Sequence, residues 1–220
     1  MSIDFFSILT SQENALLEQS KNLLQVKRSS KIFLEGNIPI GVYFLVNGKI
    51  KLFTTDAQGR EQIVHLAKPG DLMGYRALLG SDTYSCTGTA LENSEIWFIP
   101  KTIFFNLLNV NASFSHAIIK LLTAELRHAE HHLAGLTRKP VKARLAEVLL
   151  LLANTYGFEK DKKTIAVALS RADLGGLVGT ATETVIRLLN SFKKEGLLAT
   201  EGKKLRLLDV PALTKCSQNA

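Results

Sequence analysis

The chain has 220 residues, of which 46% are hydrophobic and 21% are charged, with 15 glycines and 5 prolines. This composition is typical of a folded globular protein and excludes a mainly disordered or fibrous one. The length suits one large domain or two small ones. The longest apolar stretch, Leu145 to Ala153, has about half the length that a membrane-spanning helix needs, and it contains Glu147. We therefore expect no membrane partner.

The N-terminus and the cysteines indicate a cytoplasmic location. The residues from Met1 to Asp4 include neither the basic start nor the apolar core of a secretory signal. Cys86 and Cys216 are too few for a disulfide framework or for the four thiolates of an iron–sulfur cluster. Both observations fit a reducing compartment.

The net charge of +7 is unevenly distributed along the chain. Residues 1–139 contain 14 basic and 12 acidic residues, whereas residues 140–220 contain 13 and 8. The C-terminal part is therefore the more basic per residue, as is typical of a surface that meets phosphate. Charge alone does not identify such a protein, because many basic proteins bind no nucleic acid.

The region from Val26 to Ile99 has the pattern of an antiparallel β-structure. Short runs rich in Val, Ile, Phe, Tyr and Thr alternate with glycine-containing breaks, as in a sandwich or barrel. Asn47-Gly48 predicts a tight hairpin between flanking strands, because this pair tolerates positive φ at both central positions. A second turn is expected at residues 56–59. The preceding segment, Asp4 to Leu24, is expected to form one or two short helices.

After Pro100 the hydrophobic period changes to that of a long helix. Spacings of 3 and 4 residues place six side chains on one seam, and a second apolar set lies on another face near the start of the helix. One face can cover the β-domain while the seam pairs with a second copy, although a helix buried in its own core would have the same spacing. The seam consists of Ile119, Leu122, Leu126, Ala129, Leu133 and Leu136, and the second set of Phe114, Ala117, Ile118 and Leu121.

The residues Arg138-Lys139-Pro140 predict a break after the long helix, because the residue before proline disfavours helical geometry. A further helix is expected from Val141 to Tyr156, ended by Gly157. Near the C-terminus, the segments 197–200 and 204–208 flank Gly202 and suit a small β-hairpin.

The segment from Arg171 to Leu189 has the pattern of a helix-turn-helix. Gly175 is the small residue where two helices cross and Gly179 makes the turn between them. The second helix is expected to start at Thr180 and to run to Lys194. The apolar residues directed into the junction are Leu174, Val178, Val185 and Leu188.

The second helix carries the side chains that could read bases. Thr182, Glu183 and Arg187 share one side; Arg can grip guanine with two hydrogen bonds, and Glu can accept one from cytosine. Glu183 could instead close a capping box with Thr180, or form an ion pair with Arg187. Basic residues farther along would contact phosphate, or form only a solvated face. The candidate DNA-binding residues are Ser170, Arg171, Thr180, Thr182, Glu183, Thr184, Arg187, Lys203 and Lys204.

The order of these elements and the sequence of residues 169–189 resemble the Crp/Fnr family of bacterial transcription regulators. The resemblance covers about residues 20 to 210 and implies an α+β fold with a jelly-roll-like N-terminal antiparallel β-roll, a long dimerisation helix and a C-terminal winged helix-turn-helix. The corresponding divisions are 1–110 for effector sensing, 111–139 for dimerisation and hinge, and 140–220 for DNA binding.

The resemblance also implies how the protein would meet DNA. A homodimer would bind double-stranded DNA at a two-fold symmetric site of about 20 base pairs, and RNA polymerase is the expected further partner. Glu183 and Arg187 match the two base-reading residues of the family. Ile186 stands where the Fnr branch has a serine and Thr182 where the Crp branch has an arginine, so neither branch's half-site preference transfers to this chain.

The β-roll departs from the cyclic-AMP-binding pattern. Gly74-Tyr75 replaces a glycine-glutamate pair that holds ribose, and Tyr84-Ser85 replaces an arginine-serine pair that holds the phosphate. Ala129 and Glu130 replace the polar pair that contacts the base. Cyclic AMP is therefore not expected, because the charge that would offset its buried phosphate is missing. Gly74, Tyr75, Arg76, Tyr84 and Ser85 remain a candidate pocket for another effector, although the tyrosines could simply fill the space.

No cofactor, metal site or catalytic residue is predicted. His128 and His132 share a helix face at a spacing that can bind metal, and His131 lies beside them, but no matching carboxylate or thiolate accompanies them; protonation of these histidines at a dimer seam is the other option. A cupin-like metal enzyme would need several inward ligands, and the segment from Val26 to Ile99 offers only His65.

The predicted function is a sequence-specific DNA-binding transcription regulator. An effector would rotate the C-terminal domains about the hinge near Thr137 to Pro140 until both recognition helices fit the major groove. A constitutive regulator that needs no effector is the alternative.

Overall fold

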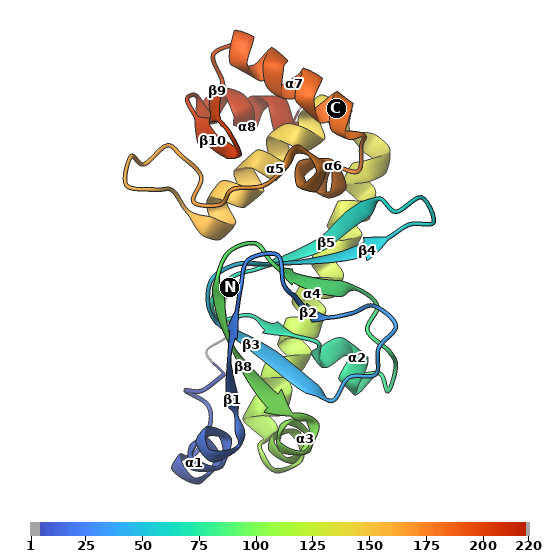
Figure 1. Cartoon of the computed structure of the whole chain (residues 1–220), viewed down its shortest axis with the longest axis vertical. Helices are drawn as coiled ribbons and strands as arrows, with labels where there is room; N and C mark the ends of the chain where they lie inside the picture. The colour runs from blue at the N-terminus through green and yellow to red at the C-terminus, as the bar shows by residue number, and fades with distance from the viewer. Residues whose placement is uncertain (1–4, 219–220) are drawn as a thin grey trace. The chain divides into compact units, whose positions relative to one another are not determined.

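The computed structural model describes residues 5–218, apart from the side chains of residues 128, 131, 132 and 134–138. The chain divides into two compact units (Figure 1). The first runs to Thr54 and again from His65 to Ala129, and the second consists of Thr55–Val64 and the chain from Glu130 onward. The α+β fold predicted from the sequence is confirmed.

The β-structure of the first unit consists of two four-stranded sheets, from which residues 55–64 of the β4–β5 hairpin extend into the second unit. Their strand orders are β1-β8-β3-β6 and β2-β7-β4-β5. The pairs β1–β8, β3–β8, β3–β6, β2–β7 and β4–β7 are antiparallel. The strands are β1 (Asn22–Val26), β2 (Lys31–Phe33), β3 (Gly41–Asn47), β4 (Ile50–Thr55), β5 (Glu61–Ala67), β6 (Leu72–Met73), β7 (Thr87–Ala90) and β8 (Ser94–Pro100).

Two apolar clusters hold this unit together. One consists of side chains from both sheets, among them Leu45, Ile50 and Ile96, which are fully buried. The other joins the β1-β8-β3-β6 sheet to the helices α1 (Ser11–Ser20), α3 (Lys101–Val110) and α4 (Ala112–Arg138). Phe114, Ala117 and Ile118, the second apolar set of the long helix, belong to this cluster. One face of α4 therefore covers the β-roll, as predicted.

The prediction of a hairpin at Asn47-Gly48 is wrong. β3 pairs with β8 and β6, and β4 lies in the other sheet, so these residues connect two sheets. Only Gly48 has a positive φ, of 100°, whereas a type I′ turn needs positive φ at both central residues. The expected turn at residues 56–59 does connect two neighbouring strands, β4 and β5.

One helix is present before the β-roll, as expected, but it is shorter than the predicted segment, and the interior of the roll also differs from the prediction. Only Ser11–Ser20 of the predicted helical segment is an α-helix, and Leu23 and Leu24 belong to β1. Thr10 begins α1 through a capping box with Glu13, whose carboxylate accepts a hydrogen bond from the Thr10 amide at 2.8 Å. A short helix that the strand pattern did not predict, α2 (Tyr75–Leu79), follows β6.

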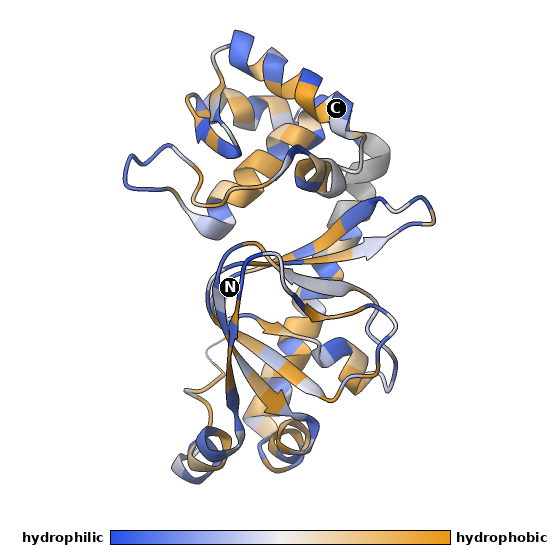
Figure 2. Ribbon diagram, in the orientation of Figure 1, coloured by the Kyte–Doolittle hydropathy of each residue, from blue (hydrophilic) through white to orange (hydrophobic). Residues whose placement is uncertain are grey.

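The second unit is helical around α5 (Val141–Tyr156), which begins after Pro140 and ends at Gly157, as predicted. Side chains from Ala143 to Ala153 form its buried face, and the mainly apolar character of α5 is visible in Figure 2. Around it lie α6 (Arg171–Val178), α7 (Thr182–Lys194) and α8 (Val210–Gln218). The strands β9 (Leu198–Glu201) and β10 (Lys204–Leu207) form the predicted hairpin. None of the helices in the described part of the chain is long and apolar enough to span a membrane.

Candidate functional site

The junction of α6 and α7 is built around two glycines. Gly179 adopts the left-handed conformation, with φ of 70° and ψ of 49°, at the end of α6. A Cβ on Gly175 would lie 2.9 Å from the Thr180 carbonyl oxygen, which is closer than a side chain can pack. Leu174, Val178 and Val185 are buried as expected, but Leu188 is only half-buried, and Leu189 and Phe192 complete the core instead. The close approach of Gly175 to the Thr180 backbone, together with this buried core, fixes α7 against α6.

We expect Gly175→Ala to destabilise this unit by about 1–3 kcal/mol, because the added methyl group would meet backbone that cannot move independently of the turn. The control is Ala172→Ser on the exposed side of the same helix, which should change little. The free energies of unfolding of both variants are measured by urea denaturation, with circular dichroism as the probe. Equal stability of Gly175→Ala and the wild type would contradict the close crossing.

Helix α7 begins two residues later than predicted. Its N-cap is Ala181, whose side chain makes no capping hydrogen bond, so the alternative of a capping box between Thr180 and Glu183 is not realised. The Thr180 amide instead donates to the Gly175 carbonyl oxygen at 3.1 Å, which keeps Thr180 in the turn. The capping box in this region is at α6, where Ser170 pairs with Asp173. Ser170 therefore holds the start of α6 with its hydroxyl.

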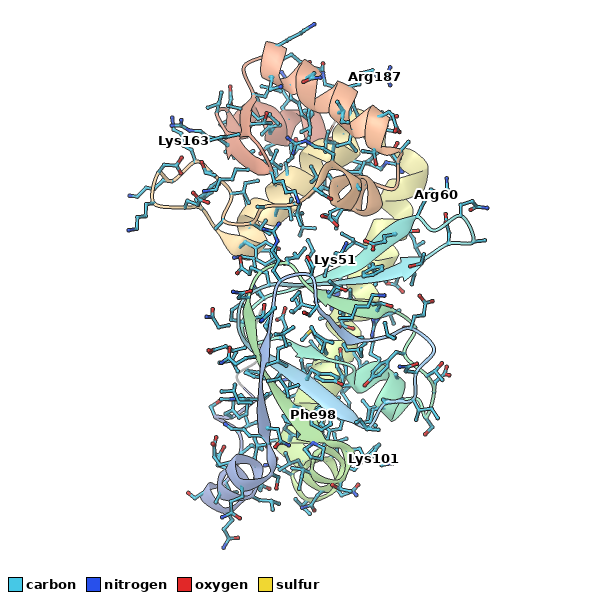
Figure 3. All side chains as sticks on the ribbon, in the orientation of Figure 1. Lys51, Arg60, Phe98, Lys101, Lys163 and Arg187 are labelled. Atoms are coloured by element: carbon cyan, nitrogen blue, oxygen red, sulfur yellow. The ribbon has the colours of Figure 1, made fainter. Side chains whose placement is uncertain are left out.

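The outer face of α7 consists of Glu183, Ile186, Arg187 and Asn190, all exposed. The alternative of an ion pair between Glu183 and Arg187 is not realised, and neither side chain has a hydrogen-bond or ion-pair partner among the described residues. Figure 3 shows Arg187 projecting from α7. Thr182 and Thr184 are half-buried beside this face.

Asn190 is a candidate that the sequence analysis missed. It lies three residues after Arg187 and seven after Glu183, so the helical period alone places it on the same face. An asparagine amide can bond to adenine with both its donor and its acceptor, and the exposed Ile186 can contact a thymine methyl group. The outer face of α7 thus presents the guanidinium of Arg187, a carboxylate, an amide and an apolar side chain.

The wing consists of β9, β10 and the turn Gly202-Lys203 between them. Lys203 is exposed at the tip, whereas Lys204 Nζ lies 2.8 Å from Glu159 Oε1 and Arg206 Nε lies 3.6 Å from Asp161 Oδ2. Hydrogen bonds from the Thr164 amide and hydroxyl, and then from the Lys163 amide, lower the pKa of Asp161 to about 2. Arg171, at the start of α6, donates from Nη2 to the Gly202 carbonyl oxygen at 3.0 Å.

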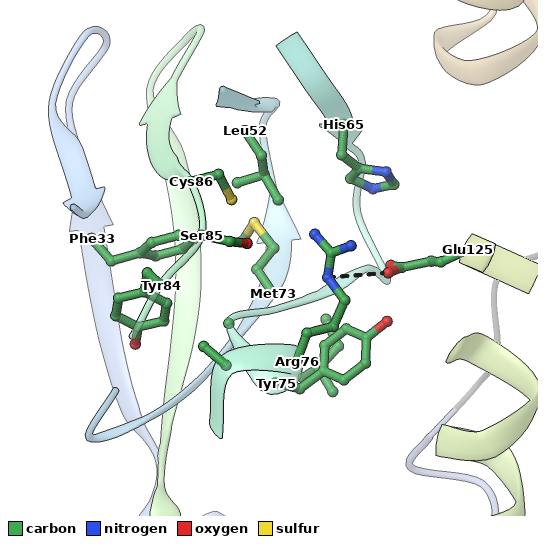
Figure 4. Close-up of a pocket in the computed structure, with 13 residues that line it drawn as sticks. Phe33, Leu52, His65, Met73, Tyr75, Arg76, Tyr84, Ser85, Cys86 and Glu125 are labelled. Atoms are coloured by element: carbon green, nitrogen blue, oxygen red, sulfur yellow. Dashed lines mark ion pairs between the residues drawn. The ribbon is translucent and has the colours of Figure 1, made fainter. Parts of the chain in front are cut away.

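The predicted effector residues of the β-roll come together around one small cavity (Figure 4). Gly74, Tyr75, Arg76, Tyr84 and Ser85 all line it. Its volume of about 30 Å³ is far below the roughly 300–1,000 Å³ of pockets that hold small-molecule ligands. The Tyr84 ring stacks on Phe33 with 4.4 Å between the ring centroids, and Tyr75 is 2% exposed. The tyrosine side chains occupy the space, so a nucleotide would have to displace them.

The charged groups of this cavity are paired with each other. Arg76 Nε lies 3.4 Å from Glu125 Oε2 on α4. Within the described part of the chain, the buried Tyr75 hydroxyl and Glu125 Oε2 make no hydrogen bond of ordinary geometry. Burial and then the negative charge of Glu125 raise the pKa of Tyr75, which stays protonated. Burial likewise raises the pKa of the Cys86 thiol, so this cysteine is an unreactive wall of the cavity.

We expect Tyr75→Phe to leave the free energy of unfolding unchanged within about 1 kcal/mol, because the lost hydroxyl has no ordinary hydrogen bond. Tyr75→Ala should cost about 3–5 kcal/mol, since it removes a buried ring. Urea denaturation of the two variants separates the ring from the hydroxyl. A loss of more than about 2 kcal/mol in Tyr75→Phe would mean that the hydroxyl is hydrogen-bonded in solution.

The seam of α4 faces solvent in the single chain. Ile119, Leu126 and Leu133 are 58%, 62% and 64% exposed, Leu122 is half-buried and Ala129 is exposed; the side chain of Leu136 lies outside the described residues. This finding contradicts the alternative of a helix buried in its own core. The side chains of His128, His131 and His132 also lie outside the described residues. Among the side chains that are described, no group of three or more His, Cys, Asp or Glu residues could hold a metal ion.

Comparisons with known proteins agree with this architecture. Residues 23–111 match the cyclic nucleotide-binding domain family, and residues 143–216 match the Crp-like helix-turn-helix domain family. The regulatory protein HlyX of Actinobacillus pleuropneumoniae is 30% identical over 205 residues, which cover 90% of this chain and 84% of that protein. The anaerobic regulatory protein of Pasteurella multocida is 28% identical over 91% of this chain and 75% of its own length. The structure of FixK2 from Bradyrhizobium japonicum is similar with a TM-score of 0.80, at 23% identity, over 91% of this chain and 98% of that one.

Proposed function

Because the chain belongs to the Crp/Fnr family of transcription regulators, we propose that it acts as a homodimer that reads a two-fold symmetric DNA site through the outer face of α7. Proteins of this kind are DNA-binding regulators and not enzymes.

One observation carries the proposed reading of DNA. Glu183 and Arg187 are exposed on one side of α7 and have no partner among the described residues, so their hydrogen-bonding groups are available to base edges. Lys193 and Lys194 at the end of the helix and Lys203 in the wing are exposed as well. Contacts from these lysines to phosphate would set affinity, whereas Arg187 would set sequence preference. Thr182 and Thr184 would support these contacts from the edge of the face.

The proposed dimer uses the exposed seam of α4. Ile119, Leu126 and Leu133 recur at intervals of seven residues, with Leu122 and Ala129 between them, which is the spacing of a two-stranded coiled coil. Exposed leucine and isoleucine in a continuous row favour burial against a second copy. Two-fold symmetry would present the two recognition helices to successive half-sites, one helical turn of DNA apart.

We further propose that residues 1–110 sense a signal, residues 111–139 dimerise and residues 140–220 bind DNA in the cytoplasm, where the dimer contacts RNA polymerase. The signal is not cyclic AMP, because the cavity holds tyrosines where a nucleotide's ribose and phosphate would lie and pairs its arginine with Glu125. A constitutive regulator is the second candidate, and the tyrosine-filled cavity favours it.

The proposal is tested by selecting bound sites from a random double-stranded DNA pool with the purified full chain. A two-fold symmetric motif whose half-sites lie about one helical turn apart is expected. A motif with a single half-site would overturn the dimer. A pool with no enriched motif, both alone and with a cell metabolite extract added, would overturn sequence-specific reading.

A further inference from the structure

The wing carries three basic residues, but only one of them is free of a carboxylate. Lys204 and Arg206 are paired with Glu159 and Asp161, and the hydrogen bond with Glu159 raises the pKa of Lys204. Lys203 is exposed at the tip and has no ion-pair partner in the described part of the chain. For Lys204 or Arg206, binding a phosphate would compete with binding the carboxylate of Glu159 or Asp161. Lys203 could bind a phosphate without breaking an ion pair.

The tip that carries Lys203 is attached to the helix-turn-helix by one side chain. Arg171 Nη2 donates to the carbonyl oxygen of Gly202, the residue directly before Lys203, at 3.0 Å. The backbone of Arg171 is itself held, because the capping box of Ser170 and Asp173 fixes the first turn of α6. The strands of the wing are held by backbone hydrogen bonds between residues 163–165 and β10 and by the buried Leu205 and Leu207. These contacts lie in the body of the hairpin, so the bond from Arg171 is what links the exposed turn itself to α6.

One of the other donors of Arg171 is poorly placed for a ligand in solvent. Nη1 is buried and has no hydrogen-bond partner among the described residues. Burial lowers the pKa of the guanidinium. Arg171 is thus half-buried, with Nη1 turned away from solvent and Nη2 bound to the wing, in contrast to the exposed Lys203.

We propose that Arg171 is a positioning residue, which holds the wing tip so that Lys203 binds a DNA phosphate. Arg171 was predicted from the sequence as a direct DNA contact, and the two roles give different results. The proposal rests on the proposed function, because Lys203 needs a DNA backbone to contact.

The test is a double-mutant cycle of Arg171→Ala and Lys203→Ala, with affinity for the selected DNA site measured at several salt concentrations. The slope of log K against log salt is negative, and losing one phosphate contact in each protomer reduces its magnitude by about 2 for the dimer. We expect this decrease in each single variant and the same decrease, not twice as much, in the double variant. A decrease of about 4 in the double variant would overturn the proposal, because it would make Arg171 an independent phosphate contact. An unchanged slope in Arg171→Ala would overturn it too.

Two further measurements separate positioning from general loss of structure. Arg171→Lys keeps the charge but lacks the planar guanidinium that reaches Gly202. We therefore expect its affinity to depend less steeply on salt, as in Arg171→Ala. An unchanged salt dependence in Arg171→Lys would overturn the proposal. In the free protein, NMR relaxation should report greater mobility of residues 201–204 in both Arg171 variants, with unchanged thermal melting. Unchanged mobility of residues 201–204 would overturn the positioning role of Arg171, whether or not the wild type binds DNA. Failure of the wild type to bind DNA would instead refute the proposed function. The control for loss of a positive charge is Lys215→Ala, which removes an exposed lysine on α8 and should leave the salt dependence unchanged.

Discussion

Arg187→Ala should weaken binding to the selected site by about thirtyfold or more, because each protomer loses a two-hydrogen-bond contact worth about 1–3 kcal/mol. The reason is the free guanidinium at the centre of the outer face of α7, which is exposed and has no partner among the described residues. Fluorescence anisotropy titrations with the selected site and with a scrambled one measure the loss. Binding to the scrambled site should change far less, since only a base contact depends on sequence.

Arg187→Lys distinguishes base reading from attraction to phosphate. A lysine keeps the charge but cannot form the paired hydrogen bonds to guanine. We expect this variant to keep the salt dependence of the wild type and to lose its preference for the selected site. If Arg187→Lys discriminated as well as the wild type, Arg187 would act as a point charge and the reading would lie elsewhere on the face. Lys215→Ala on α8 should bind as the wild type does.

The misplaced start of α7 has a physical cause that spacing does not reveal, whereas Asn190 could have been predicted. Sequence spacing indicates which side chains share a face, so Glu183, Arg187 and in principle Asn190 could be assigned to one side of α7. Where the helix begins depends on the bond between the Thr180 amide and the Gly175 carbonyl oxygen. That bond keeps Thr180 in the turn, although its hydroxyl and Glu183 have the spacing of a capping box.

Strand pairing and ion pairing over long separations could not be predicted. Asn47-Gly48 has the local chemistry of a hairpin, but β3 pairs with β8, whose residues come about fifty positions later in the chain. Lys204 was expected to face phosphate, and its partner Glu159 is 45 residues away. The cavity residues were found only because the resemblance to a family aligned them. Composition and periodicity alone do not bring Tyr75 and Tyr84 together.

Leu126→Glu should convert the dimer to a monomer and abolish tight binding to the two-fold symmetric site. Leu126 is 62% exposed in the single chain, in the middle of the α4 seam. In the proposed dimer, two glutamates would face each other in an apolar interface, which costs several kcal/mol unless they are neutralised. Sedimentation velocity measures the assembly, and titration with full and half sites measures the consequence. Affinity for a single half-site should be preserved, because α7 is untouched.

Ala124→Glu is the matched control, because it adds the same charge at an exposed position outside the seam, two residues earlier on α4. It should remain dimeric and bind the full site as the wild type does. A dimeric Leu126→Glu would refute the seam as the interface. A monomer that still bound the full site tightly would show that DNA itself brings two chains together. Two-fold symmetry would then come from the DNA site, and an effector in the β-roll could not act by reorienting α4 within a preformed dimer.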